Sequence, residues 1–371
     1  MTAEKLAPLQ SLSALGQSVW VDYLSRDSIQ GGHLQELIDD YAVVGATSNP
    51  TIFESAMSTG DAYDDQLQEL AARGSDVDAS FWALAEQDIV DACDVFRAVW
   101  ERGGRRDGYV SLEVDPRLAY DTLETFREAM SLHERVDRPN LMVKIPATKP
   151  GLAAIEDVVA KGRSINVTLI FSLRRYAEVA ESYIRGIERL VADGGDPRGV
   201  ASVASFFVSR IDTEADRRLQ ELGAPDALKG KLAIANAKLA YEHYLEVFSG
   251  PRWEYLAGKG ATPQRVLWAS TSTKNPAYPD TMYVDGLIGP DTIDTMPEAT
   301  IAAYQDHGRP ELRLQEGVED ARATLEELRR AGIDYDDLTE TLEREGVEKF
   351  ASSFEELMSS LAAKRESLAA V

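Results

Sequence analysis

The sequence predicts an α/β protein, a (β/α)8 TIM barrel with additional C-terminal helices. Three observations support this prediction: eight short runs rich in apolar and β-branched residues alternate with helical patterns, the chain has 371 residues, and no Gly-x-Gly-x-x-Gly motif follows the first run. Alternating strands and helices indicate a parallel sheet, and eight such units at this length favour a closed barrel. An open nucleotide-binding sheet would carry the glycine motif at its first turn.

The expected strands are nearly continuous in apolar or small residues, as in parallel strands covered on both faces. They span residues 19–24, 43–48, 109–114, 141–146, 165–171, 200–208, 265–271 and 282–287. Apolar residues recur at helical spacing over residues 78–102, 121–135, 152–161, 174–192 and 228–248. We expect one domain over residues 1–371, with the barrel over about 18–305 and two or three appended helices over about 306–371. Gly332 and Gly346 are natural helix stops within this last segment.

Composition excludes several classes of protein. The formal net charge of −24 disfavours nucleic acid and anionic membranes as partners. The single cysteine, Cys93, lies in an apolar helical pattern and is expected to be buried and structural. The first ten residues carry no basic and apolar leader, and the four histidines have no ligand spacing. We therefore expect a cytoplasmic protein without a structural zinc site; a homodimer is compatible with the fold, although no interface stripe is evident.

Lys144 is the most informative candidate for catalysis. In a parallel barrel, functional side chains lie at the carboxyl ends of the strands, and Lys144 interrupts the apolar run Leu-Met-Val-Lys-Ile-Pro. Burial of an amine disfavours its ammonium form, and a neutral amine attacks ketones. A lysine that merely pairs with a carboxylate is the structural alternative, but the barrel context favours a catalytic nucleophile.

Two carboxylates are expected beside this lysine. Asp22 lies in Val-Trp-Val-Asp-Tyr-Leu and Glu113 in Val-Ser-Leu-Glu-Val-Asp, each within or directly after an expected strand. Schiff-base chemistry needs proton transfers that positioned carboxylates can provide. Each carboxylate alone could instead form an ion pair or ligate magnesium, although a lysine between the two would repel a cation.

Polar residues at the ends of other strands can complete the site. Asn49 precedes Pro50 and fits a helix N-cap that also faces the site. Asn166 and Thr168 alternate along one strand and so share one face. Ser205 and Arg210 flank the end of the next strand, and Arg210 could clamp a phosphate or pair with Asp212 on the surface. Ser270 and Lys274 belong to a hydroxyl-rich loop that also suits a phosphate.

These segments together resemble the transaldolase family. The matching pieces appear in family order over roughly residues 18–300 and read GATSNPTIF from Gly45, VSLEVD from Val110, LMVKIPAT from Leu141, INVTLIFS from Ile165 and ASFFVSRID from Ala204. The stretch WASTSTKNP from Trp268 looks like the longer bacterial branch of the family. Each piece alone is weak, but the set is highly specific.

The resemblance implies a metal-free and cofactor-free class I aldolase-type barrel of the non-oxidative pentose phosphate pathway. In such an enzyme Lys144 forms a Schiff base with a sugar phosphate, and Asp22 moves protons during cleavage and formation of the carbon–carbon bond. Glu113 acts through a water held by Thr168. The resemblance assigns substrate binding to Asn49, Asn166, Ser205 and Arg210, whereas Phe207 shapes the pocket.

One departure concerns a second phosphate-binding arginine, which one branch of the family carries in a Ser-Phe-Arg sequence near the end of the seventh strand. Here the corresponding positions read Ser270-Thr-Ser, without an arginine. We expect Lys274 to take the place of that arginine as the second phosphate-binding cation. The nearest rival function is a fructose 6-phosphate aldolase that releases dihydroxyacetone; such relatives are much shorter and carry Gln where Glu113 stands. A non-catalytic sugar-phosphate-binding barrel and a metal-dependent barrel enzyme are more distant alternatives.

Overall fold

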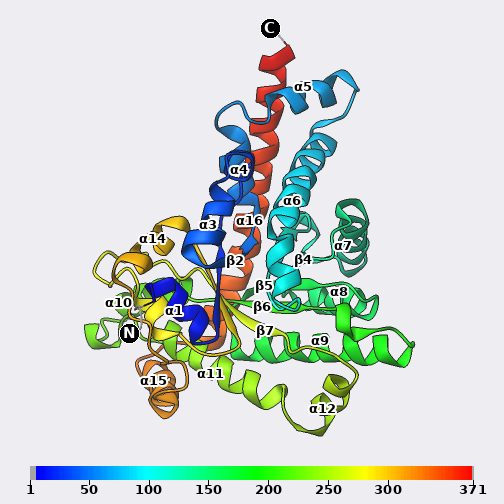
Figure 1. The fold of residues 1–371 in the computed structure, drawn as a ribbon. Coiled ribbons are helices and arrows are strands. Elements are labelled where there is room, and N and C mark those ends of the chain that lie inside the picture. The colour runs from blue at the N-terminus through cyan, green and yellow to red at the C-terminus, as the bar shows by residue number, and fades with distance from the viewer. Residues whose placement is uncertain (1–5, 370–371) are drawn as a thin grey trace, which may run out of the picture.

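The computed structural model describes residues 6–369 and contains a closed barrel of eight parallel strands (Figure 1). Strands pair in chain order, and the last pairs with the first in a register that joins Gln17 to Thr292 and Val21 to Met296. The predicted fold class is therefore confirmed. The strands are β1 (Gln17–Val21), β2 (Val43–Thr47), β3 (Val110–Glu113), β4 (Leu141–Pro146), β5 (Ile165–Ile170), β6 (Ser202–Phe207), β7 (Arg265–Ala269) and β8 (Thr292–Met296).

Helices follow every strand, and the five predicted helical segments correspond to α6, α7, α8, α9 and α11. Before β3 the helices are α1 (Pro8–Ala14), α2 (Arg26–Gln30), α3 (His33–Tyr41), α4 (Pro50–Ser58), α5 (Asp64–Ala72) and α6 (Val77–Arg102). Between β3 and β7 they are η1 (Pro116–Leu118), α7 (Thr122–Val136), α8 (Lys149–Ala160), α9 (Leu173–Ala192), η2 (Pro197–Gly199), α10 (Ser209–Glu221), η3 (Asp226–Leu228), α11 (Leu232–Val247) and α12 (Gly250–Gly258). After β7 they are α13 (Met282–Gly286), α14 (Glu298–His307), α15 (Val318–Arg330) and α16 (Tyr335–Ala369).

Burial on both faces explains why the strands are nearly continuous in apolar residues. Almost every strand residue is buried, and Trp20, Phe206 and Trp268 are among the largest fully buried side chains. Cys93 is also fully buried, within α6, as the sequence predicts. Helices outside and side chains inside leave no strand face to water, as in other parallel barrels.

The prediction of a strand at residues 282–287 is wrong. This apolar run forms the short helix α13, and the eighth strand lies further along the chain, at Thr292–Met296. The run buries Tyr283 and Val284 as one helical turn. A short apolar segment has no periodicity that distinguishes a buried turn of helix from a buried strand.

The sequence pattern does not predict β8 as a strand, because this segment contains three polar residues. All three are buried and hydrogen-bonded: Thr292 accepts from Gln17 at 3.0 Å, Asp294 accepts from Thr271 at 2.7 Å, and Thr295 pairs with Thr47 at 2.7 Å. Polar groups can be buried when partners satisfy them. These partners are distant in sequence, so the pattern of β8 alone does not indicate a strand.

The C-terminal extension is helical, as predicted, and ends in the long helix α16. Figure 1 shows α16 running from the barrel along α4, α5 and α6, which it contacts. Gly332 lies between α15 and α16 at a φ of 100° and is a helix stop, as predicted. The same prediction for Gly346 is wrong, because this residue lies inside α16. A Cβ there would come within 3.0 Å of Leu169 in β5, so glycine permits close packing of α16 on the barrel.

We predict that Gly45→Ala destabilises the barrel by about 1–3 kcal/mol, the usual effect of overpacking a core. A Cβ on Gly45 would lie 2.5 Å from Cε2 of Trp20, a buried and rigid indole. Chemical denaturation monitored by circular dichroism measures the effect. Gly258→Ala is the matched control, because its Cβ would meet nothing within 4 Å; equal stability of the two variants would contradict the packing argument.

Candidate active site

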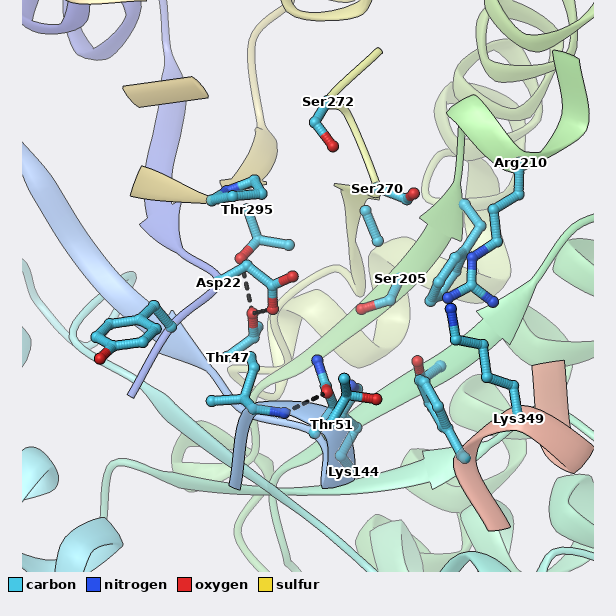
Figure 2. A pocket seen from close by; sticks show the side chains of 18 of the residues that line it. Asp22, Thr47, Thr51, Lys144, Ser205, Arg210, Ser270, Ser272, Thr295 and Lys349 are labelled. Atoms are coloured by element: carbon cyan, nitrogen blue, oxygen red, sulfur yellow. Dashed lines mark hydrogen bonds between the residues drawn. The ribbon is translucent and has the colours of Figure 1, made fainter. Parts of the chain in front are cut away.

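A cavity of about 410 Å³ opens at the carboxyl ends of the strands (Figure 2). Its wall combines hydroxyls, one carboxylate, several cations and two phenylalanine rings. The chain folds so that strand ends from all around the barrel meet here, which is where parallel barrels carry their active sites. Nine of the residues that the sequence predicts for the site line the cavity: Asp22, Asn49, Lys144, Thr168, Ser205, Phe207, Arg210, Ser270 and Lys274.

Lys144 lies in β4 with its side chain only 6% exposed. Its Nζ is 3.1 Å from Oε2 of Glu113 and donates to the carbonyl of Ser48 at 3.2 Å. The parallel register pairs Glu113 with Lys144 directly across β3 and β4, so backbone hydrogen bonding brings amine and carboxylate together. The ring of Phe350, in α16, lies 5.5 Å from the same Nζ. The amine is therefore fixed, largely shielded and still on the cavity wall.

Glu113 lies behind Lys144 and is not part of the cavity wall. Oε2 of Glu113 faces the Lys144 amine at 3.1 Å, and the hydroxyl of Thr168 is buried without a hydrogen-bond partner among the described residues. Burial raises the pKa of Glu113, and the charge of Lys144 opposes that shift. Buried polar atoms without partners are uncommon in folded proteins. Glu113 in β3 and Thr168 in β5 lie on either side of the strand that carries Lys144.

Asp22 follows β1 and accepts a 2.7 Å hydrogen bond from Thr47, which is itself 2.7 Å from Thr295 (Figure 2). Burial raises the pKa of Asp22, while Lys144 and the hydrogen bond from Thr47 oppose the shift. Asp22 thus faces the cavity as a carboxylate of increased proton affinity. The supporting hydroxyls of Thr47 and Thr295 are absent from the sequence-based prediction, because their role depends on contacts between β2 and β8.

The two asparagines occupy different levels of the site. Asn49 caps α4 through a 3.1 Å hydrogen bond from the backbone of Ile52, and it also lines the cavity, as predicted. Asn166 is fully buried one layer below the wall. It accepts a 2.7 Å hydrogen bond from Ser205 and donates to Ser111 at 3.0 Å. In this arrangement Asn166 orients Ser205, and Ser205 faces the cavity.

Three cations surround one side of the cavity: Arg210 in α10, Lys274 in the loop after β7 and Lys349 in α16. Arg210 does not pair with Asp212, since this carboxylate instead accepts from the backbone of Ala233 and from Tyr283. Burial lowers the pKa of Arg210, and burial followed by the charges of Arg210 and Lys349 lowers that of Lys274. Together, these three cations suit an anion that carries more than one negative charge.

Lys349 and Phe350 are functional candidates that sequence reasoning missed. They lie in the middle of α16, where the local pattern is that of an ordinary charged, amphipathic helix. Phe350 is 4% exposed and Lys349 is exposed, yet both line the cavity. Only the tertiary packing of α16 against the barrel brings them there. The sequence contains no local signal that would have identified them.

Within residues 6–369, no group of three or more His, Cys, Asp and Glu side chains is placed to hold a metal ion. In the same part of the chain, no helix combines the length and the apolar character needed to cross a membrane. The cavity therefore combines a shielded amine with a carboxylate behind it, a second carboxylate on the wall, and three cations at one side.

Comparison with known proteins gives a consistent result. The family model described as Transaldolase/Fructose-6-phosphate aldolase matches residues 19–361. The chain is 53% identical over 357 residues to a transaldolase of Parafrankia sp., covering 95% of this chain and 97% of the relative. It is 54% identical over 351 residues to the transaldolase of Saccharopolyspora erythraea (94% and 95%) and 54% identical over 353 residues to that of Acidothermus cellulolyticus (94% and 95%). The chain belongs to the transaldolase/fructose-6-phosphate aldolase family, and its enzymatic activity is that of a transaldolase.

Proposed function

We propose that the enzyme reversibly transfers a dihydroxyacetone unit through a Schiff base on Lys144. The donors are sedoheptulose 7-phosphate or fructose 6-phosphate, and the acceptors are glyceraldehyde 3-phosphate or erythrose 4-phosphate. The observation that carries this proposal is the position of Lys144: a shielded amine on the cavity wall, 3.1 Å from Glu113 and facing the cavity that Asp22 also lines.

The first half-reaction begins when the neutral amine of Lys144 attacks the C2 ketone of the donor. A carbinolamine forms, its hydroxyl leaves as water, and a protonated imine remains. Glu113 and Thr168 supply buried polar atoms on the two strands that flank the strand of Lys144, and Oε2 of Glu113 lies 3.1 Å from the amine. We assign them to the proton transfers at C2, with a water held between them, because carbinolamine formation and dehydration each move a proton.

Bond cleavage then depends on Asp22. Its carboxylate removes the proton of the C4 hydroxyl, the C3–C4 bond breaks, and the bonding electrons move into the imine to give an enamine on Lys144. The aldose phosphate departs. A second aldose phosphate enters, the enamine carbon forms a new bond to its aldehyde, and Asp22 returns the proton to the resulting alkoxide. Addition of water to the imine releases the ketose product and regenerates Lys144.

Retention of the three-carbon enamine requires that water does not protonate or release it. Phe350 lies over Lys144, and Phe207 forms another apolar part of the wall. At the charged side, we assign the phosphate of the sugar to Arg210, Ser270 and Lys274. The planar guanidinium of Arg210 suits a phosphate, and it forms no ion pair with Asp212, which accepts from the backbone of Ala233 instead.

The proposal places the enzyme in the non-oxidative pentose phosphate pathway and in the cytoplasm. The buried thiol of Cys93 forms no disulfide, in agreement with a reducing compartment. The proposal also includes a homodimer, an arrangement that the barrel fold permits.

Replacement of Lys144 by Met, which keeps most of the side-chain volume, should lower turnover by at least about 10⁴-fold, as expected for loss of a covalent nucleophile. Borohydride reduction in the presence of fructose 6-phosphate, followed by intact-mass and peptide mapping, should give a three-carbon adduct on the Lys144 peptide of the natural enzyme and none in the variant. Unchanged melting would show that the variant is folded. An adduct on another lysine would reject the assignment.

Transfer and simple aldol cleavage differ in the fate of the three-carbon unit. With fructose 6-phosphate and no acceptor, we expect the natural enzyme to release dihydroxyacetone at no more than about 1% of the transfer rate, because the enamine is shielded. A coupled dihydroxyacetone assay measures the release. Steady release at a rate near that of transfer would establish the rival, a fructose 6-phosphate aldolase.

Asp22→Asn should lower kcat by about 10²–10⁴-fold, the usual contribution of a general acid–base group. In the natural enzyme the ionised form of Asp22 is required for cleavage. Its pKa is raised above the ordinary value of 3.8, so kcat/KM should fall with decreasing pH well before that value is reached. A pH profile of kcat/KM for fructose 6-phosphate measures this limb. Full activity of the natural enzyme down to pH 4 would contradict the role of Asp22.

A further inference from the structure

The charged side of the cavity contains more positive charge than the proposed phosphate site uses. Arg210 and Lys274 are assigned to the phosphate above, but Lys349 also lines the cavity. Figure 2 shows the Lys349 side chain reaching from α16 toward Arg210. The chain has 63 acidic and only 39 basic residues. Unpaired cations are therefore unexpected in this protein, because carboxylates are abundant.

None of these three cations forms an ion pair within the described chain, residues 6–369. The only hydrogen bond of the Lys274 ammonium is to Ser272, at 2.8 Å. Arg210 stacks on the ring of Phe207, with 5.4 Å between guanidinium carbon and ring centre. By contrast, other arginines near α16 are paired: Arg175 binds Glu343, and Arg218 binds Asp337. Glu343 and Asp337 of α16 are thus used by other cations, and no ion pair of Lys349 is formed within residues 6–369.

Neighbouring like charges raise the free energy of the unliganded enzyme. The pKa of Lys274 is lowered by its burial and then by the charges of Arg210 and Lys349, and the charge of Asp22 opposes this shift, so both cations lie close enough to Lys274 to repel it. A multiply charged anion between them would convert this repulsion into attraction. A cluster of three cations that forms no ion pair within residues 6–369 and lies on a cavity wall is therefore arranged for a ligand anion rather than for the stability of the protein.

The position of Lys349 is fixed although its side chain is exposed. The next residue, Phe350, is buried over Lys144. One turn earlier, Gly346 packs on Leu169 and Phe171 at the end of β5. These contacts hold this turn of α16 against the mouth of the barrel. The Lys349 ammonium therefore projects over the same cavity as Arg210 and Lys274.

We propose that Lys349 is a third cation for the substrate phosphate, which makes α16 a functional part of the active site. The proposal rests on the proposed function, because the anion is taken to be the phosphate of the sugar. It assigns one turn of the C-terminal helix two tasks: Phe350 covers the Schiff-base lysine and Lys349 binds the opposite end of the substrate. The enzyme then favours phosphorylated sugars through residues outside the barrel as well as inside it.

The test compares Lys349→Gln with Arg365→Gln, a control on the same helix that removes the same charge about 24 Å away at 1.5 Å per residue. Inorganic phosphate is the probe, used as a competitive inhibitor against fructose 6-phosphate. We expect Lys349→Gln to raise both the phosphate inhibition constant and the KM for fructose 6-phosphate about 3- to 10-fold, the effect of losing one partly solvated charge contact. The kcat should change less than about 2-fold, and Lys349→Arg should restore binding.

A second comparison uses the unphosphorylated acceptor D-glyceraldehyde, at saturating donor. Its KM should be the same in the natural enzyme and in Lys349→Gln, because there is no acceptor phosphate to bind. A Lys349→Gln variant that binds inorganic phosphate as tightly as Arg365→Gln would overturn the inference. An equal rise in KM for D-glyceraldehyde and for glyceraldehyde 3-phosphate would also overturn it, because it would indicate a general disturbance of α16.

Arg210→Gln separates failure of this inference from failure of the proposed function. If Arg210→Gln weakens inorganic phosphate and Lys349→Gln does not, only the role of Lys349 is wrong. If neither variant affects inorganic phosphate, the phosphate site of the proposed function is wrong as well. Trapping on Lys144 with dihydroxyacetone, which has no phosphate, tests the Schiff base independently of both.

Discussion

The buried pair of Lys144 and Glu113 is the interaction on which the active site depends. Two charges removed from water are costly unless each has a close partner, and loss of one partner leaves the other uncompensated. The parallel register of β3 and β4 places the residues directly opposite one another, so the separation of 3.1 Å follows from backbone hydrogen bonding. The closed barrel holds that register rigidly. Each further group of the site is positioned relative to this amine.

The barrel and the segments outside it contribute different parts of the site. Strand ends supply Lys144, Asp22 and Thr168, which in the proposed mechanism act at the reacting carbons and need fixed geometry. The cations come from the start of α10, from the loop after β7 and from α16. Long cationic side chains on such segments can adjust to a phosphate at the far end of sugars of different length. This division suits an enzyme that must accept more than one donor and acceptor.

The sequence was sufficient to predict the barrel and the neighbourhood of Lys144, because both depend on local patterns. Carboxyl ends of parallel strands meet at one end of a barrel, so polar residues near the ends of different strands, such as Asp22, Glu113 and Ser205, can be grouped without a structure. The position of β8 could not be predicted, since Thr292 and Asp294 are satisfied by partners distant in sequence. Gly346 was misread for a related reason: its role depends on the approach of Leu169 and not on the end of a helix.

Lys349 could not be predicted for the same reason, because its position depends on packing against residues distant in sequence. The charges around Lys349 also connect the two ends of the cavity. In the free enzyme Lys274 and Arg210 lower the pKa of Asp22, against the larger effect of burial, which raises it. In the proposed complex a phosphate neutralises these cations and removes that opposing effect. Asp22 then has a higher proton affinity when a phosphorylated sugar is bound than when the cavity is empty. Binding at the charged side thereby makes the carboxylate a stronger base where the C4 proton must be removed.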